Sequence, residues 1–205
     1  MKKLFKIQKN NGMTYVEIIV VLSIFFVMTS IILFNYREFQ AKVDIKNFAS
    51  DVASKVVEAQ KSSLAGKLPP SSHQPANPTT WKPSYGVYFD TTERKQFIYF
   101  TDISVINALY DGSLSCSDSD ECLDRITITK NNSISGLKVF GNNCPADANV
   151  NNLTIVFKRP NYRAIMTSSP PCSNISHAQI IVASPQSATT TANINIYPSG
   201  RIQVN

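Results

Sequence analysis

The chain has 205 residues, of which 43% are hydrophobic and 17% are charged, and its formal net charge at pH 7 is +6. This length allows one modest domain with an appendage. Four lysines lie in residues 1–12, which contain no acid, and removing them leaves a charge of +2 before the termini are counted: Lys2, Lys3, Lys6 and Lys9. The positive charge is therefore concentrated at the N-terminus, and it does not indicate a nucleic-acid-binding surface over the rest of the chain.

An apolar run of nineteen residues, 16–34, follows this basic stretch and contains a single charge, Glu17. As a helix it would span roughly 28 Å, about the hydrocarbon thickness of a bilayer. A lone carboxylate is costly to bury there, so a partner is expected. If the chain were cut after Gly12, Met13 would gain an α-amino group. The same amine in a neighbouring copy could then pair with Glu17 and fix the register between two helices.

The residues around this position resemble the class III signal of type IV pilins and type II secretion pseudopilins. The match consists of a short basic leader, glycine, a hydrophobic residue, threonine, an aromatic residue, valine and glutamate, followed by the apolar run. The resemblance implies that residues 1–12 are a leader, and that a prepilin peptidase cuts between Gly12 and Met13 and methylates the new amine. Glu17 would be the assembly glutamate of the fifth mature position. Met13 stands where Phe is usual, and Phe34 stands where many major pilins have Pro.

The resemblance also implies where the protein works and what it contacts. Residues 13–35 would be a transmembrane and filament-core helix, with one pass through the bacterial cytoplasmic (inner) membrane. The lysines of the leader favour a cytoplasmic N-terminus, so the rest would face outward and later lie in an extracytoplasmic filament. The expected partners are other pilin or pseudopilin subunits, the prepilin peptidase, an inner-membrane assembly platform and the lipid bilayer.

Two more ordinary interpretations of this N-terminus stay open. A secretory signal has an apolar core of about 7–15 residues, followed by a cleavage site with small residues. Here the run is longer, the glycine precedes it and an acid lies inside it. A plain signal-anchor would fit the length, but it would leave Gly12 and Glu17 without an explanation.

The uniformly apolar run gives way to an amphipathic pattern over residues 36–66. Phe48, Val52 and Val56 recur every fourth position, and charged and polar residues cover most of the remaining surface. This spacing predicts a helix with one buried stripe. No glycine or proline occurs from residue 13 to residue 65, whereas Gly66 and a Pro-Pro pair follow. We therefore expect one continuous helix of about 53 residues, roughly 80 Å long.

Residues 67–84 form a proline-rich linker, and residues 85–205 have the pattern of a β-rich domain. Trp81 is expected to pack its ring back on the domain. Segments 85–90 and 96–101 alternate around a turn at 91–95 and predict a hairpin. Further strands are expected at 125–130, 137–140, 153–158, 163–167, 179–183, 193–197 and 201–204. Gly200 suits the tight turn before the last strand. The fold class expected is α+β, a long N-terminal helix packed on an antiparallel sheet.

The β-rich half resembles the minor pseudopilins of the GspH/FimT class, although more loosely than the leader does. The segments that carry this resemblance are 85–89, 97–100 and 194–202. It implies a structural, minor subunit of a type IV pilus or a type II secretion pseudopilus. The alternative is a DNA-binding or adhesive minor pilin that acts in DNA uptake or attachment.

Four cysteines fall in the part expected to be exported, and an even number there favours disulfides. Of three pairings, we favour Cys116 with Cys122, which closes a short polar loop, and Cys144 with Cys172, which joins two loops. Zinc is the alternative, but no CxxC pair occurs and the two histidines, His73 and His177, are isolated.

Five acids cluster around the first of these loops: Asp111, Asp118, Asp120, Glu121 and Asp124. Carboxylates on a constrained loop could hold calcium, but their spacing matches no EF-hand, and a solvated acidic turn is the simpler interpretation. We expect no metal site and no cofactor.

Three cations lie beside an aromatic residue at 158–163, and Lys158, Arg159 and Arg163 could contact DNA phosphates. Basic residues at the end of a hairpin usually have no such role.

Catalysis has little support, because the chain has no HExxH, nucleophile elbow or phosphate loop. Cys172 and His177 are five residues apart, but a disulfide would remove the thiol. We therefore expect a protein that is not an enzyme.

Overall fold

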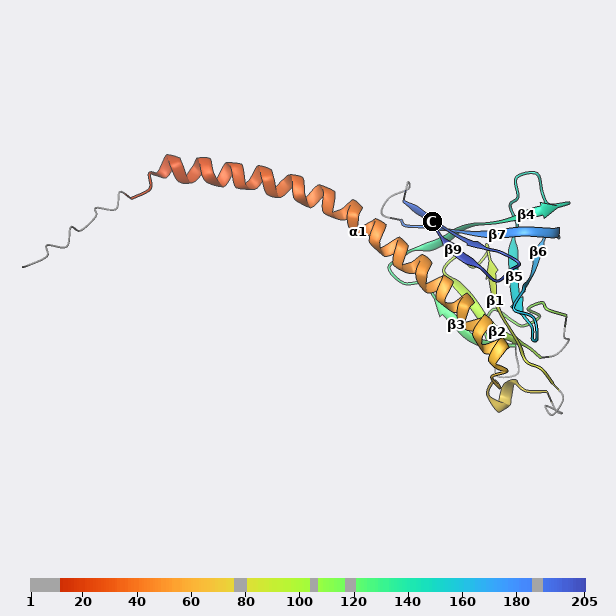
Figure 1. Cartoon of the computed structure of the whole chain (residues 1–205). Helices are drawn as coiled ribbons and strands as arrows, with labels where there is room; N and C mark the ends of the chain where they lie inside the picture. The colour runs from red at the N-terminus through yellow and green to blue at the C-terminus, as the bar shows by residue number, and fades with distance from the viewer. Residues whose placement is uncertain (1–11, 76–80, 104–106, 117–120, 186–189) are drawn as a thin grey trace, which may run out of the picture. The chain divides into compact units, whose positions relative to one another are not determined.

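The computed structural model describes residues 12–75, 81–103, 107–116, 121–185 and 190–205. It confirms the α+β class: one long helix, α1 (Tyr15–Ala65), precedes nine antiparallel strands (Figure 1). The chain divides into two units that meet between Gln40 and Ala41. The leader lysines expected to set the membrane orientation lie outside the described residues.

The first unit consists of the N-terminal part of α1. The helix is continuous over 51 residues, as the absence of glycine and proline predicts, and it begins at Tyr15 rather than Met13. The later start has a local cause, because Thr14 occupies the N-cap position. Its carbonyl oxygen accepts the Ile18 N–H at 3.2 Å, and its hydroxyl accepts the Glu17 N–H at 3.3 Å.

The second unit begins on the amphipathic part of α1, whose predicted stripe is buried. Phe48, Val52 and Val56 all pack into the main hydrophobic core with apolar side chains of both sheets. The helix ends at Ala65, and Gly66 follows it with a φ of +62°. The Gly66 N–H donates to the Ser63 carbonyl oxygen, and the Lys67 N–H donates to the Ser62 carbonyl oxygen. These paired bonds are the usual glycine termination of a helix.

A short 3-10 helix, η1 (Ser71–His73), lies in the linker, and the strands follow. The five-stranded sheet has the order β3-β2-β1-β5-β6 and the four-stranded sheet has the order β4-β7-β8-β9. The strands are β1 (Ser84–Asp90), β2 (Gln96–Asp102), β3 (Cys122–Thr127), β4 (Ser133–Asn142), β5 (Asn152–Phe157), β6 (Ala164–Ser169), β7 (Ser173–Ala183), β8 (Thr191–Ile196) and β9 (Ile202–Val204).

All nine predicted strands are present, but two details of the prediction were wrong. The strands form two sheets rather than one. Three strands also begin at least three residues earlier than expected, β3 at Cys122, β4 at Ser133 and β7 at Ser173. β7 begins with two exposed polar residues, Ser173 and Asn174, and the pairing of β3 and of β4 contains a register shift, so strict hydrophobic alternation did not mark these starts.

Candidate functional site

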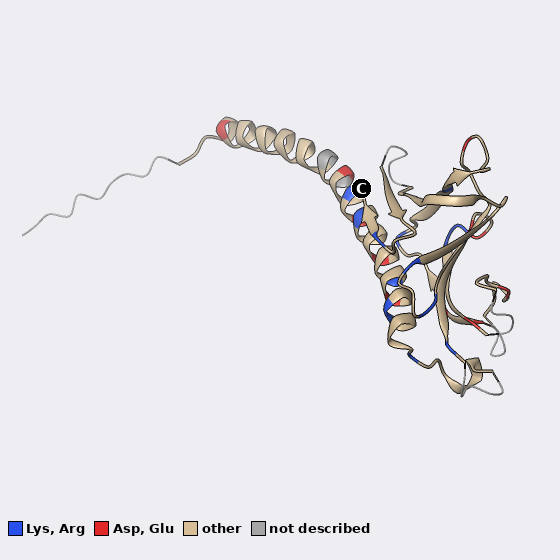
Figure 2. Cartoon of the chain, turned by 45° about the vertical axis from the view of Figure 1, so that its right-hand side comes forward, with Lys and Arg blue, Asp and Glu red and all other residues tan. Residues whose placement is uncertain are grey.

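In the first unit, no other described residues pack on the apolar part of α1 and bury it. Every large hydrophobic side chain described between residues 13 and 33 is at least 42% exposed. The helix is long and apolar enough to cross a membrane. In Figure 2 the first part of this helix, from the red turn at its start to the grey segment, is drawn without charged residues. An apolar surface that surrounds a helix on all sides needs lipid or other protein chains to remove it from water.

Glu17 lies in the first turn of this helix, and Gly12 and Met13 precede the turn and are exposed. Among the described residues, Glu17 forms no ion pair. A local effect at the helix start also explains why an acid lies at position 17, and this effect was not predicted from the sequence. The pattern from Thr14 to Glu17 is that of a capping box, and an acid in the first turn also interacts favourably with the helix dipole. Any role in assembly must therefore be separated from this local one.

The three cations suggested for DNA contact come together around one hollow of about 550 Å³. Lys158, Arg159 and Arg163 line it with Pro160, Asn161 and other neighbours, and none of the described lining residues carries a carboxylate. Lys158 and Arg163 are exposed, whereas Arg159 is half-buried. The structure thus brings the predicted residues to one place, on the turn that joins β5 and β6.

This turn also has a structural role, because it packs on the end of α1. The buried Ser63 hydroxyl donates to the Phe157 carbonyl oxygen at 2.7 Å, and the Gln60 amide donates to the Tyr162 carbonyl oxygen at 3.2 Å. The Arg159 guanidinium lies so close to Gly66 that a side chain at position 66 would clash with it. A cation at this place interacts favourably with the helix C-terminus, so Arg159 contributes to the helix end.

The acidic loop is not simply a solvated turn, contrary to the expectation from sequence. Glu121 is 4% exposed, and its two carboxylate oxygens accept the backbone N–H groups of Ile103 and Asp111 at 3.1 and 3.0 Å. The Asp124 carboxylate lies 3.8 Å from Lys55 Nζ. Asp118 and Asp120 lie outside the described residues. Among the residues described, no group of three or more ligands could hold a metal ion.

A second buried carboxylate, Asp102, lies at the end of β2 beside this loop. It is 1% exposed, and one of its oxygens accepts the Ala108 N–H at 2.9 Å. Its other oxygen is buried without a hydrogen-bond partner among the described residues, as is the hydroxyl of Ser84, its cross-strand neighbour. Burial is the main cause that raises the pKa of Asp102 to about 6, and the nearby Glu121 charge adds to it while Lys158 opposes it.

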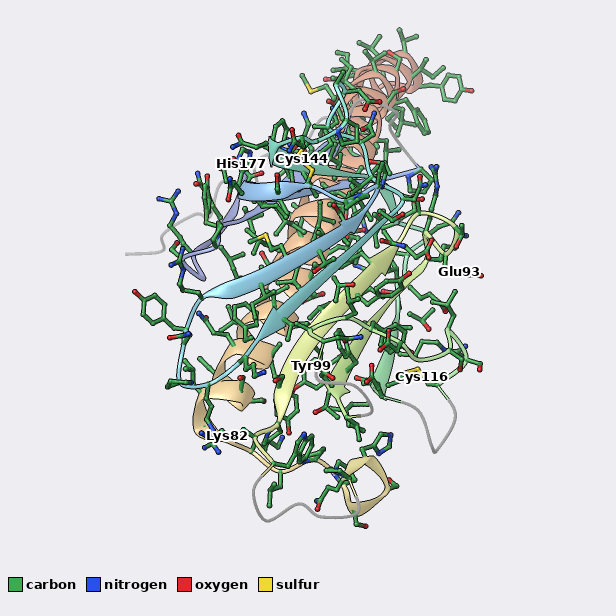
Figure 3. The ribbon with its side chains drawn as sticks, turned by 90° about the vertical axis from the view of Figure 1, so that its right-hand side faces the viewer. Lys82, Glu93, Tyr99, Cys116, Cys144 and His177 are labelled. Atoms are coloured by element: carbon green, nitrogen blue, oxygen red, sulfur yellow. A yellow bond between two sulfur atoms is a disulfide. The ribbon has the colours of Figure 1, made fainter. Side chains whose placement is uncertain are left out.

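Both disulfides join the cysteines favoured from the sequence. Cys116 is bonded to Cys122, with 5.1 Å between their Cα atoms, and Cys144 is bonded to Cys172, with 4.6 Å. Figure 3 labels Cys144 near the top of the view and Cys116 lower down on the right. His177 is stacked on Phe140, with ring centroids 4.4 Å apart, so its neighbourhood is that of a packed side chain. Trp81 is half-buried, as expected.

Comparisons with known proteins add no identification: no family model, no curated protein and no solved structure matches the chain.

Proposed function

We propose that the chain is a structural subunit of a filament, of the type IV pilus or type II secretion pseudopilus kind. It is inserted in the cytoplasmic membrane, cut after Gly12, methylated on Met13 and assembled through the apolar part of α1. The observation that carries this proposal is the exposed apolar helix with one acid, Glu17, in its first turn directly after the Gly12–Met13 bond. On this account the protein is a structural subunit and not an enzyme.

The physical argument concerns the two charges that meet during assembly. Before assembly, the apolar helix surface is covered by lipid, and Glu17 is near the membrane boundary. In a packed filament the same surface is covered by neighbouring helices, where an unpaired carboxylate would be costly. The amine at Met13 of an adjacent subunit supplies the opposite charge. Because pairing requires a defined offset between helices, it also selects their register.

Variants at the first turn test this role. Glu17→Ala and Glu17→Gln both remove the charge, whereas Thr14→Ala weakens the helix cap and keeps the charge. We expect both Glu17 variants to be lost from filaments, measured by immunoblotting of sheared filament fractions, while Thr14→Ala is incorporated. Glu93→Ala, in an exposed turn, is the matched control for the loss of an acid. Normal incorporation of Glu17→Gln would refute the charge-pairing argument.

Binding of DNA is a second candidate function, and the hollow lined by three cations favours it. Lys158 and Arg163 are the residues to change, since Arg159 also supports the helix end. The double variant Lys158→Ala/Arg163→Ala should weaken binding of a labelled DNA duplex by the detergent-solubilised chain. Because two phosphate contacts are lost, the affinity should also depend less steeply on salt: the negative slope of log affinity against log salt should become smaller in magnitude by about 2. Arg94→Ala, another exposed cation, is the control. An unchanged slope in the double variant would reject this function.

A further inference from the structure

The edge of the four-stranded sheet at β9 is open to another strand. β9 pairs with β8 on one side, and Asn193 and Asn205 exchange two backbone hydrogen bonds of 3.0 and 2.9 Å. In an antiparallel ladder such pairs alternate with pairs that do not bond to each other. Ile202 and Val204 are therefore the residues whose N–H and C=O groups point away from β8. These four backbone groups have no hydrogen-bond partner among the described residues, and they form the free edge.

A groove of about 500 Å³ lies between this edge and α1. Figure 1 shows β9 alongside the C-terminal half of the helix. The groove is lined by Ala53, Ser54, Val57, Glu58, Lys61, Ser62, Ile202 and Val204. Its apolar members come from both elements, while Glu58 and Lys61 provide charges. The space is of the size that proteins use to bind ligands.

The side of α1 that faces the five-stranded sheet differs, because polar contacts bridge it to β2 and β3 around two smaller hollows of about 330 and 210 Å³. Lys55 and Asp124 join the helix to β3, with 3.8 Å between the ammonium and the carboxylate. The hydroxyl of Tyr99, on β2, donates to Ser62 Oγ at 3.2 Å. Within the described part of the chain, no hydrogen bond or ion pair joins the residues that line the groove on α1 to β9. β9 contains neither proline nor a charged residue, two of the devices that protect a sheet edge, although its length of three residues limits how long an added strand can pair with it.

We infer that the groove between β9 and α1 is a docking site for an extended segment of a partner protein, which adds to the sheet as a strand. An extended backbone is the occupant that supplies donors and acceptors at the spacing of the Ile202 and Val204 groups. Side chains at alternate positions of that segment would point toward Ala53 and Val57. The partner segment is therefore one with apolar residues at every second position.

A synthetic peptide with the β8 sequence of residues 191–197 is a suitable probe, because β8 already pairs with β9 with its apolar residues facing the core. The fluorescently labelled peptide is titrated into the full chain in detergent micelles, and binding is measured by anisotropy. A matched peptide with proline in place of Ile194 is the control ligand. Hydrogen exchange of the Ile202 and Val204 amides is followed with each peptide.

Two variants on different elements test the geometry. Val204→Pro removes an outward N–H and leaves the β8 bonds in place, and Val57→Glu places a charge in the groove. Each should weaken binding by about tenfold or more, whereas Gln203→Ala, whose side chain lies on the other face, should not. The β8 peptide should also slow exchange at residues 202 and 204. Absence of binding, or equal binding by Val204→Pro, would overturn the inference. Protection of the same amides by self-association alone would show that the occupant is a second copy, and it would also contradict the partner proposed.

Discussion

The buried carboxylate of Asp102 makes the stability of the β-domain depend on pH. Its pKa is raised from 3.8 to about 6 in the folded chain, chiefly by burial. The folded state therefore favours the protonated form, so the free-energy cost of this group is almost zero below about pH 3, grows between about pH 4 and 6, and is complete above the folded pKa. A difference of about two pKa units corresponds to about 3 kcal/mol in the free energy of unfolding.

Asp102→Asn removes this titration and keeps an oxygen that can accept the Ala108 N–H. We expect the stability gained by the variant over the wild type to be about 2 kcal/mol larger at pH 7.5 than at pH 4.5. The assay is urea unfolding of the full chain in nonionic micelles, followed by the fluorescence of the single tryptophan, Trp81. Asp124→Asn, at a carboxylate that is 55% exposed, is the control. An equal difference between Asp102→Asn and wild type at both pH values would refute the reasoning.

Two further predictions concern the end of α1. Ser63→Ala deletes a buried hydrogen bond to the Phe157 carbonyl and should lower the free energy of unfolding by about 1–3 kcal/mol, measured by urea unfolding. Gly66→Ala places a methyl group against the Arg159 guanidinium at a positive φ, so it should cost at least about 1 kcal/mol in the same assay. Gly136→Ala, where an added methyl group meets only ordinary contacts, should cost less. A smaller loss for Gly66→Ala than for Gly136→Ala would contradict the explanation of the helix end.

The sequence predicted those features that depend on a repeating pattern. The stripe of Phe48, Val52 and Val56 predicted the buried face of the helix, and the alternation of apolar and polar residues predicted the centre of every strand. The helix end followed from Gly66 and the prolines after it. The two disulfides were predicted because Cys116 and Cys122 can close a short loop, which leaves Cys144 and Cys172 to bond to each other.

Other features depend on contacts between distant residues and had no local signal. The division into two sheets depends on which strands pair, for example β1 with β5 across sixty residues of chain. The burial of Asp102 and Glu121 depends on how the loop after β2 folds back, so composition suggested only a solvated acidic turn. The structural role of Arg159 requires the fold, because Gly66 is its neighbour only in space. The N-cap at Thr14 was the exception, since the capping-box pattern was present in the sequence.

The central claim is that the chain functions without its lysine-rich leader, with a new amine available to Glu17. The mass of the N-terminal peptide, measured on protein isolated from cells that contain a prepilin peptidase, tests it most directly. The account predicts a peptide that begins at Met13 and carries one added methyl group. A peptide that still begins at Met1 would contradict it.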